Sequence, residues 1–404
     1  TFIIVSTSSY TALITPTANG AVTIDVNENV ANDLFGNLNT AATQVSSQYD
    51  ATRPSVQIQN VPENTKVPFI ATFAFDKIVT GFIGSDISIS NGTASDFLSL
   101  GGSLYTALIT PTANGVVTLN VNENVAQDLS GNLNTAAAQV STNYDTLRPS
   151  VAIQNVPENT NGAFTATIVF SEPVSNFILN DISVSNATVS DFIPVSGSNY
   201  TALITPIAEG VVTLNINENV AEDLSINLNT AATQVSSTFN GTRPSVQIQN
   251  VPANSSAPFT ATFAFSEPVI DFIPTDITVT NATVSTFIIV STSSYTALIT
   301  PTANGAVTLD VNANVAQDIA GNLNTAATQV TSQYDASRPS VAIQNVPENT
   351  KAAFIATFAF DKIVTGFIIG DISISISNGT ASNFISLGGS LYTALITPTA
   401  NGVV

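Results

Sequence analysis

The chain has 404 residues, and its 8 basic and 28 acidic residues give a formal net charge of −20. So few basic side chains argue against nucleic acid and anionic membrane surfaces as partners, because both are bound by clustered Lys and Arg. Cys, Met, Trp and His are absent, which excludes disulfides, zinc–thiolate sites and the Ser–His–Asp and Cys–His catalytic arrangements. With 44% hydrophobic and only 9% charged residues, the composition is that of a folded chain.

An exact repeat of 95 residues organises the chain. The tetrapeptide RPSV begins at residues 53, 148, 243 and 338, and the motif YTALITPTANG, once as YTALITPIAEG, begins at 10, 105, 200, 295 and 392. We predict three complete repeats flanked by a C-terminal part and an N-terminal part of further repeats, with the boundaries 1–52, 53–147, 148–242, 243–337 and 338–404. Because the chain starts and stops within a repeat, we expect an excerpt of a longer array. No apolar run approaches the 18 residues of a membrane-spanning helix, and no signal peptide opens the chain.

Alternation of apolar and polar residues with a period of two predicts half-buried strands. In the first complete repeat the inward-facing positions are, in chain order, Val56, Ile58, Phe69, Ala71, Phe73, Phe75, Tyr105, Ala107, Ile109, Val117, Leu119 and Val121. Turn sequences separate these runs, namely NVPEN (60–64), TPTANG (110–115) and DLSGN (128–132). About seven short strands and no convincing helix in each repeat predict an all-β fold of antiparallel sandwiches.

The joints between repeats are short. Only about four to six residues, such as DTLRPS (145–150), separate the last strand of one repeat from the first strand of the next. A proline fixes φ at each joint; these prolines are Pro54, Pro149, Pro244 and Pro339. We therefore expect an extended, semi-rigid rod of roughly 160 Å, built from sandwiches roughly 35–40 Å long.

Three stretches resemble the bacterial Ig-like repeat: FTATIVFSEPVSNFILNDISVSNATVSDF (164–192), ENVAQDLSGNLNTA (123–136) and YDTLRPSV (144–151). The resemblance covers the whole chain. It implies an extracellular stalk of tandem β-sandwiches in a very large bacterial surface adhesin, of the gliding or biofilm type. It also implies that ligands such as surface polysaccharide or host and substratum surfaces are bound by other regions, while the partners here are the other repeats of the same chain. Two alternatives stay open. Each repeat binds a ligand weakly and the whole array gains binding strength by avidity, or the chain assembles laterally into a surface filament.

The repeats differ at a few positions. The sequence SEPV at 171–174 and 266–269 is replaced by DKIV at 76–79 and 361–364. Ile226 stands where the other repeats carry Gly36, Gly131 and Gly321. If that glycine needs a positive φ, Ile226 strains the turn by about 1 kcal/mol or more, unless the loop takes another shape. DISISISN (371–378) is two residues longer than DISISN (86–91), which predicts a longer hairpin or a bulge.

Calcium is the small ligand that the acidic residues favour, because it prefers several carboxylate and carbonyl oxygens. An Asp precedes the Arg of RPSV by three residues, and a Glu lies in the VPEN loop just beyond. The candidate ligands are Asp50, Glu63, Asp145, Glu158, Asp335 and Glu348. One junction has Asn240 and Ala253 in these places, and no D-x-D-x-D-G loop occurs. The alternative is that each Asp forms a turn hydrogen bond or pairs with the following Arg, such as Arg148.

No enzyme and no other cofactor is predicted, because the acidic residues recur at the same offset in every repeat and an active site in each sandwich is improbable. The triplets NGT or NAT at 91–93, 186–188, 281–283 and 378–380 fit a glycosylation acceptor, but Asn also favours turns at strand ends. The recurring Tyr10, Tyr105, Tyr200, Tyr295 and Tyr392 could form a carbohydrate platform. Their alternation with Ala and Ile favours a place in or near the core instead.

Overall fold

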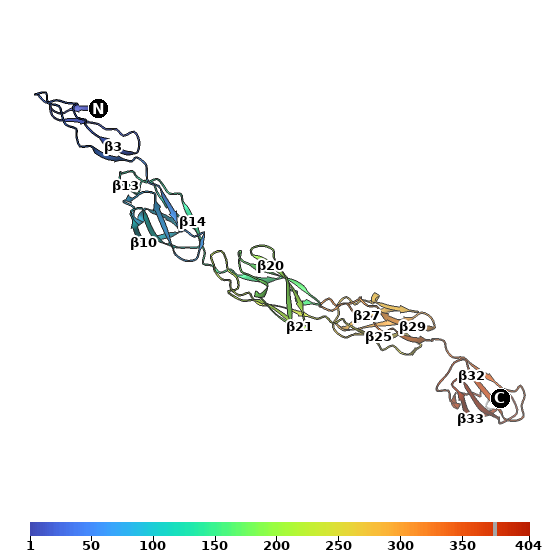
Figure 1. The fold of residues 1–404 in the computed structure, drawn as a ribbon. Helices are drawn as coiled ribbons and strands as arrows, with labels where there is room; N and C mark the ends of the chain where they lie inside the picture. Colours follow the sequence, from blue (N-terminus) through green and yellow to red (C-terminus); the bar gives the residue numbers. More distant parts are fainter. Residues whose placement is uncertain (375–377) are drawn as a thin grey trace. The chain divides into compact units, whose positions relative to one another are not determined.

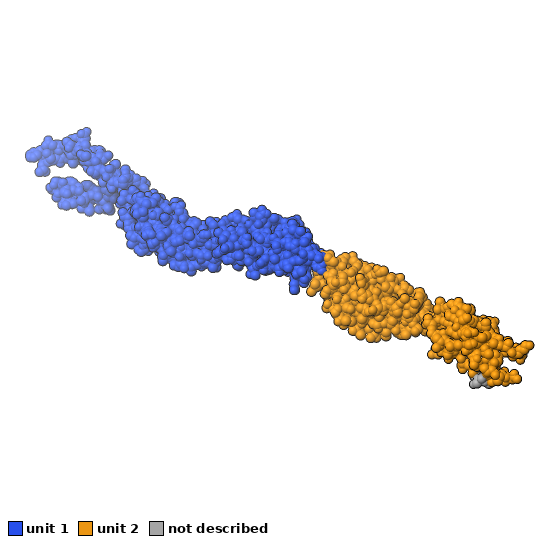
Figure 2. Space-filling model, turned by 90° about the horizontal axis from the view of Figure 1, so that it is seen from below, with its two compact units in different colours: residues 1–240 blue, residues 241–404 orange. Residues whose placement is uncertain are grey.

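The computed structural model describes residues 1–374 and 378–404. The extra residues predicted to form a longer hairpin or a bulge in the segment 371–378 fall outside the described part. The chain divides into two compact units, residues 1–240 and residues 241–404 (Figure 2). The regular elements described are β-strands and 3₁₀-helices of three residues, so the predicted all-β fold is confirmed.

Each complete repeat folds into two four-stranded sheets. Figure 1 shows the repeats following one another along the chain. In the first repeat (53–147) the elements are β5 (Val56–Gln59), β6 (Asn64–Thr65), β7 (Phe69–Phe75), β8 (Val79–Thr80), η1 (Gly84–Asp86), β9 (Ile87–Ser90), β10 (Gly92–Gly101), β11 (Leu104–Pro111), β12 (Gly115–Val121), β13 (Gln127–Asp128) and β14 (Val140–Tyr144). One of these sheets has the order β10-β11-β7-β5, and the other has the order β6-β14-β12-β9, while β8 and β13 form an additional two-stranded sheet. Neighbouring strands are antiparallel except β6 and β14, which run parallel. Side chains of both sheets meet in one core, so the repeat is a sandwich.

The second and third repeats have the same two sheets. The second repeat contains β15 (Val151–Gln154), β16 (Asn159–Thr160), β17 (Phe164–Phe170), η2 (Leu179–Asp181), β18 (Ile182–Ser185), β19 (Ala187–Pro194), β20 (Asn199–Pro206), β21 (Gly210–Ile216) and β22 (Val235–Phe239). The third contains β23 (Val246–Gln249), β24 (Asn254–Ser255), β25 (Phe259–Phe265), η3 (Pro274–Asp276), β26 (Ile277–Thr280), β27 (Ala282–Ser291), β28 (Ser294–Pro301), β29 (Gly305–Val311) and β30 (Val330–Tyr334). The strand order and the parallel pair at the first strand of the second sheet recur in both.

The two end segments hold fewer strands. Residues 1–52 form two two-stranded sheets from β1 (Phe2–Ile4) and β2 (Tyr10–Ala12), and from β3 (Gly20–Ile24) and β4 (Val45–Tyr49). The C-terminal segment forms one four-stranded sheet from β31 (Val341–Gln344), β32 (Phe354–Phe360), β34 (Leu391–Pro398) and β33 (Gly379–Gly388), with the 3₁₀-helix η4 (Ile369–Asp371).

The predicted inward faces are the buried faces. All twelve inward-facing positions of the first repeat are buried, except Ile58 and Phe69, which are partly buried against the same core. Thr72 lies on the opposite face of β7 and is nevertheless buried. The side-chain amide of Asn60 covers it and donates a hydrogen bond to its hydroxyl at 2.8 Å. Strand alternation therefore predicted the core well. The same Asn–Thr contact recurs at Thr167 and Thr262, which are only partly buried.

A cluster of aromatic rings fills one end of each complete sandwich. In the first repeat Tyr105 lies 5.2 Å from Phe82 and stacks on Phe97 at 5.6 Å, between ring centroids. Its hydroxyl donates to the backbone oxygen of Val79 at 3.0 Å. The core position predicted for the recurring tyrosines is confirmed for the four at positions 105, 200, 295 and 392. The prediction is wrong for Tyr10, which is 53% exposed. Among the residues that the structure describes, only Phe2 places an aromatic ring against Tyr10.

The turn that contains Ile226 keeps the shape of its sister turns. Ile226 has φ +66°, and Gly131 at the equivalent position has φ +83°. This is the left-handed region, which a β-branched residue adopts only with strain. The predicted need for a positive φ is confirmed, and the alternative of a different loop shape is excluded.

We expect Ile226→Gly to stabilise the second repeat by about 0.5–1 kcal/mol, because strain of roughly 1–2 kcal/mol is relieved while glycine adds freedom to the unfolded chain. The Ile226 side chain is mostly exposed, so little burial is lost. Hydrogen exchange of the second repeat within the whole chain measures the change. The reciprocal variant Gly131→Ile should destabilise the first repeat, since a Cβ there meets no atom within 4 Å and only φ opposes it. Unchanged exchange in both variants would refute the strain.

Candidate functional site

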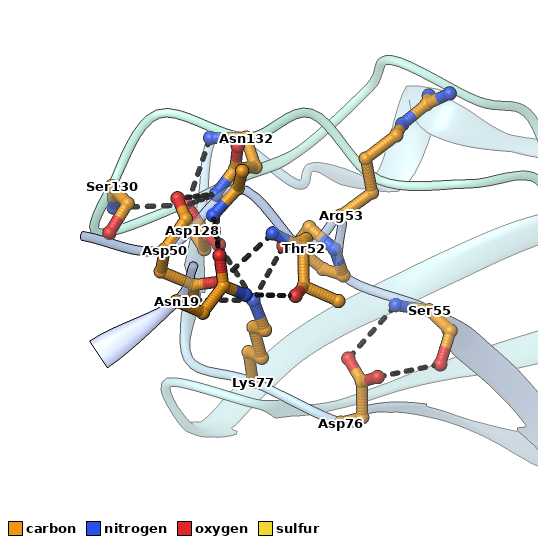
Figure 3. Close-up of polar contacts among 12 residues, drawn as sticks. Asn19, Asp50, Thr52, Arg53, Ser55, Asp76, Lys77, Asp128, Ser130 and Asn132 are labelled. Atoms are coloured by element: carbon orange, nitrogen blue, oxygen red, sulfur yellow. Dashed lines mark hydrogen bonds and ion pairs between the residues drawn. The ribbon is translucent and has the colours of Figure 1, made fainter. Parts of the chain in front are cut away.

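Polar side chains hold three of the linkers, those with Asp50, Asp145 and Asp335, just after the last strand of a repeat. Asp50 follows β4, and its Oδ1 accepts hydrogen bonds from the backbone N–H of Thr52 at 2.9 Å and from Asn19 at 3.1 Å (Figure 3). Asn19 belongs to the recurring YTALITPTANG motif. The same arrangement recurs with the pairs Asn114 and Asp145, and Asn304 and Asp335. The predicted turn hydrogen bond of the Asp is thus present.

A loop of the next repeat holds the linker from the other side. Asp128, in the turn DLSGN, accepts hydrogen bonds from the backbone N–H groups of Ser130 and Asn132, both at 2.9 Å. The Asn132 amide then donates to the backbone oxygen of Asp50 at 2.7 Å. In the second repeat Asn227 makes the same contact to Asp145 at 2.8 Å. These contacts connect consecutive repeats within the first compact unit.

A lysine occupies the centre of the junction before the first repeat. The ammonium of Lys77 donates to Asp50 Oδ2 at 2.6 Å, to Asp128 Oδ2 at 3.2 Å and to the backbone oxygen of Thr52 at 2.5 Å (Figure 3). Its hydrogen bond to Asp50 raises the pKa of Lys77 and lowers the pKa of Asp50. Burial acts to raise the pKa of Asp128, which is only 6% exposed, but hydrogen bonds from Asn132 and Lys77 outweigh it and hold that pKa at about 2.

The second compact unit repeats this lysine contact. Lys362 donates to Asp335 Oδ2 at 2.5 Å and to the backbone oxygen of Ser337 at 2.8 Å. The hydrogen bond from Lys362, with those from Ser337, lowers the pKa of Asp335 to about 2. Lys77 and Lys362 are the lysines of the two DKIV sequences. This sequence therefore places a cationic group beside the linker Asp.

The junction between the first and second repeats has a carboxylate in the lysine position. Glu172, from SEPV, replaces the lysine, and one carboxylate oxygen each of Asp145, Glu172 and Asp223 lie within 4.8 Å of one another. Burial raises the pKa of Glu172, and repulsion from Asp223 and Asp145 raises it further. Among the residues that the structure describes, this is the one group of three acidic side chains that lie so close together.

The glutamates predicted as calcium ligands lie elsewhere. The backbone oxygen of Glu63 accepts a hydrogen bond from Asn143 at 3.0 Å, beside the last strand of its own repeat, and Glu158 contacts Thr238 in the same way. Strand β5 carries the chain along the sandwich before it reaches the VPEN loop, so Asp50 and Glu63 lie at opposite ends of the repeat. The side chains of Glu63, Glu158 and Glu348 are exposed. The structure therefore corrects the predicted pairing of each linker Asp with the following VPEN glutamate.

The arginines of RPSV also differ from the prediction. Arg53 forms an ion pair with Glu123 at 3.2 Å and donates to the backbone oxygen of Leu133 at 2.8 Å, both in its own repeat. Arg148 contacts Glu218 and Leu228 equivalently. The predicted alternative of an Asp–Arg pair across the linker is therefore wrong, because the arginine side chain points into the repeat that it begins.

The asparagines of the glycosylation triplets hold turns. Asn91 has φ +53°, and its side-chain amide donates to the backbone oxygen of Ala113 at 2.7 Å. Asn186 and Asn281 make the same contact at 2.6 and 2.7 Å. The side-chain nitrogen that would carry a glycan therefore donates a hydrogen bond within the turn. This agrees with the interpretation of these triplets as turns at strand ends.

These observations define a class, a tandem array of antiparallel β-sandwiches joined by short polar linkers. The chain belongs to the bacterial Ig-like domain family, whose model matches residues 50–144, 145–239, 240–334 and 335–403. The predicted membership of this family and the tandem Ig-like fold are confirmed. A comparison with curated protein sequences found no match. No helix in the described part of the chain is long and apolar enough to cross a membrane.

Solved structures of bacterial surface proteins are similar at low identity. The adhesin FdeC of Escherichia coli is 16% identical over 71% of this chain and 98% of its own, with a TM-score of 0.42. Invasin, described as a bacterial integrin-binding protein, is 13% identical over 87% of this chain and 74% of its own, with a TM-score of 0.34. InvD of Yersinia pseudotuberculosis is 14% identical over 71% and 99%, with a TM-score of 0.33.

Proposed function

We propose that this chain is a stalk segment of a large bacterial cell-surface adhesin, which holds a binding region away from the cell. The proposal rests on hydrogen bonds across the boundaries between repeats. In these, the side-chain amides of Asn132 and Asn227 donate to the backbone oxygens of Asp50 and Asp145. A linker held from both sides resists bending. Repeated Ig-like domains that are joined in this way suit a spacer.

The composition and the repetition support a structural role over catalysis. The acidic and amide side chains at the junctions are engaged in holding turns and linkers, and the chain has no His or Cys to act as a base or nucleophile. The membership of the bacterial Ig-like family supports location at the cell surface, where gliding or biofilm adhesins act.

Small-angle X-ray scattering of the whole chain tests the proposal. Three complete sandwiches and the two end segments, arranged end to end, should give a maximum dimension of roughly 160 Å and a radius of gyration of roughly 45 Å. A chain of this length folded into one compact body would have a radius of gyration of only about 22 Å, and that result would refute the stalk. Growth of the particle with protein concentration would favour the alternative of a lateral filament.

A further inference from the structure

We propose that the edge strand β27 of the third repeat is a self-association site, which pairs antiparallel with β27 of a second copy of this chain. The inference goes beyond the proposed stalk function, because it concerns contacts between two chains rather than contacts along one. It is carried by a strand that lacks the residues by which its sister strands oppose such pairing.

The first argument is the position of β27 at the border of its sheet. In the sheet β23-β25-β28-β27 the only described strand that pairs with β27 is β28. One side of this ten-residue strand therefore presents its backbone N–H and C=O groups to no neighbouring strand. The occupant that fits such an edge is another extended strand, because only extended backbone matches the spacing of these groups.

The second argument comes from the equivalent edge strands of the other two complete repeats. These strands carry gatekeeper residues, namely Asp96 and Ser99 in β10, and Asp191 and Pro194 in β19. A charge on an edge strand opposes pairing, and a proline removes the N–H that pairing needs. In β27 the two gatekeeper positions are occupied by Thr286 and Ile289, which leave the edge without this protection.

The third argument identifies the occupant as a second copy of β27. Ile288, Ile289 and Val290 are 52%, 67% and 62% exposed, and a twofold pairing brings these apolar residues against the same three of the other chain. The chain has a net charge of −20, so two copies repel one another over most of their surface. Pairing of β10 with itself would also bring two copies of Asp96 together, whereas β27 has no charged residue.

The fourth argument is backbone strain at a gatekeeper position. Thr286 has φ +45°, and its counterparts Asp96 and Asp191 have φ +50° and +48°. Aspartate tolerates this left-handed conformation, but a β-branched threonine adopts it only with strain. Strained residues are typical of functional sites. The third repeat therefore holds the less favourable residue at the position where an aspartate would oppose pairing.

Sedimentation equilibrium of the whole chain at about 0.15 M salt, which screens the net charge, tests the proposal. A single edge buries a small area, so we expect weak association, with a mass that rises from 41.8 kDa towards twice that value between about 10 µM and 1 mM. The double variant Thr286→Asp, Ile289→Ser carries the residues of β10 and should weaken association roughly tenfold or more, because like charges would meet. Ile207→Ser is the matched control, since Ile207 is also 67% exposed but lies in a loop of the second repeat.

A transfer of the site to the first repeat provides the converse experiment. Asp96→Thr with Ser99→Ile, added to the double variant, should restore association. Hydrogen exchange at low and high protein concentration locates the contact, with protection expected at 286–291 in wild type and at 96–101 in the transferred variant. Each of these substitutions introduces the residue of a sister strand, so the repeats should fold.

Three results would overturn the proposal. The first is a mass of one chain over the whole concentration range. The second is association that the double variant leaves unchanged, including association with protection at residues 1–6, where the sequence TFIIVS of 286–291 recurs. The third is growth beyond two chains, because a twofold pair closes on itself. A dimer that the double variant dissociates would leave the stalk function untouched.

Discussion

Phe263→Ala should destabilise the third repeat by about 3–5 kcal/mol, the usual cost of removing a large aromatic side chain from a packed core. Phe263 is 0% exposed and lies at the centre of β25, between β23 and β28. It pairs with Ile248 on one side and Tyr295 on the other, and its ring centroid lies 5.9 Å from that of Phe272. Alanine would leave a cavity that both sheets line.

Hydrogen exchange of the whole chain is the suitable measurement, because it reports the stability of each repeat separately. The first and second repeats serve as internal references that should not change. Thr260→Ala, on the exposed face of the same strand, is the matched control and should change stability by no more than about 0.5 kcal/mol. A loss below about 1 kcal/mol for Phe263→Ala would contradict a tightly packed core.

Asn324→Ala should cost the third repeat about 3–5 kcal/mol, because it removes four hydrogen bonds of a side chain that is 0% exposed. The side-chain oxygen accepts from the backbone N–H groups of Val315 and Ala316 at 2.8 and 2.9 Å. The side-chain nitrogen donates to the backbone oxygens of Asn312 and Thr325 at 2.9 and 2.8 Å. Alanine leaves two donors and two acceptors without partners inside the loop before β30.

The same exchange measurement checks this prediction. Asn254→Ala is the control within the repeat, since Asn254 is exposed and its side chain makes no hydrogen bond among the residues that the structure describes. The equivalent variants at Asn134 and Asn229 should show losses of similar size in their own repeats, because both make the same four contacts. A small effect in all three would mean that water replaces the amide, and the buried network would then not hold the loop.

The strands were predictable from the sequence because their physics is local. Side chains alternate across a strand, so the pattern around Val117, Leu119 and Val121 identifies the buried face without knowledge of the partner strand. The strain at Ile226 was predictable for the same reason, since a single residue's φ is set by its own turn. The buried asparagines were not identified, because their four contacts depend on how one loop folds back on itself.

The junction was only partly predictable because its members are far apart in the sequence. The linker position of Asp50 and Asp145 follows from spacing, but their partners Lys77 and Glu172 reach them from another loop of the next repeat. The VPEN glutamates are closer to the linker Asp in sequence than these partners are. They nevertheless lie at the far end of the repeat, because a strand separates them from the linker. The sequence feature that identifies the junction is the replacement of Lys77 by Glu172 at the same position of the next repeat. Such a reversal of charge changes which groups can be bound at that position.

The parallel pairing of β6 with β14 determines how a repeat would respond to pulling. β6 lies near the start of the repeat and β14 at its end, and they run in the same direction. Tension applied to the two ends therefore loads their hydrogen bonds, from Asn143 to Glu63 and from Asp145 to Thr65, along the strands. Bonds loaded in shear must break together, whereas an antiparallel pair pulled from one end opens one bond at a time. In each complete sandwich this parallel pair therefore resists extension at the end of the repeat that is joined to the next one.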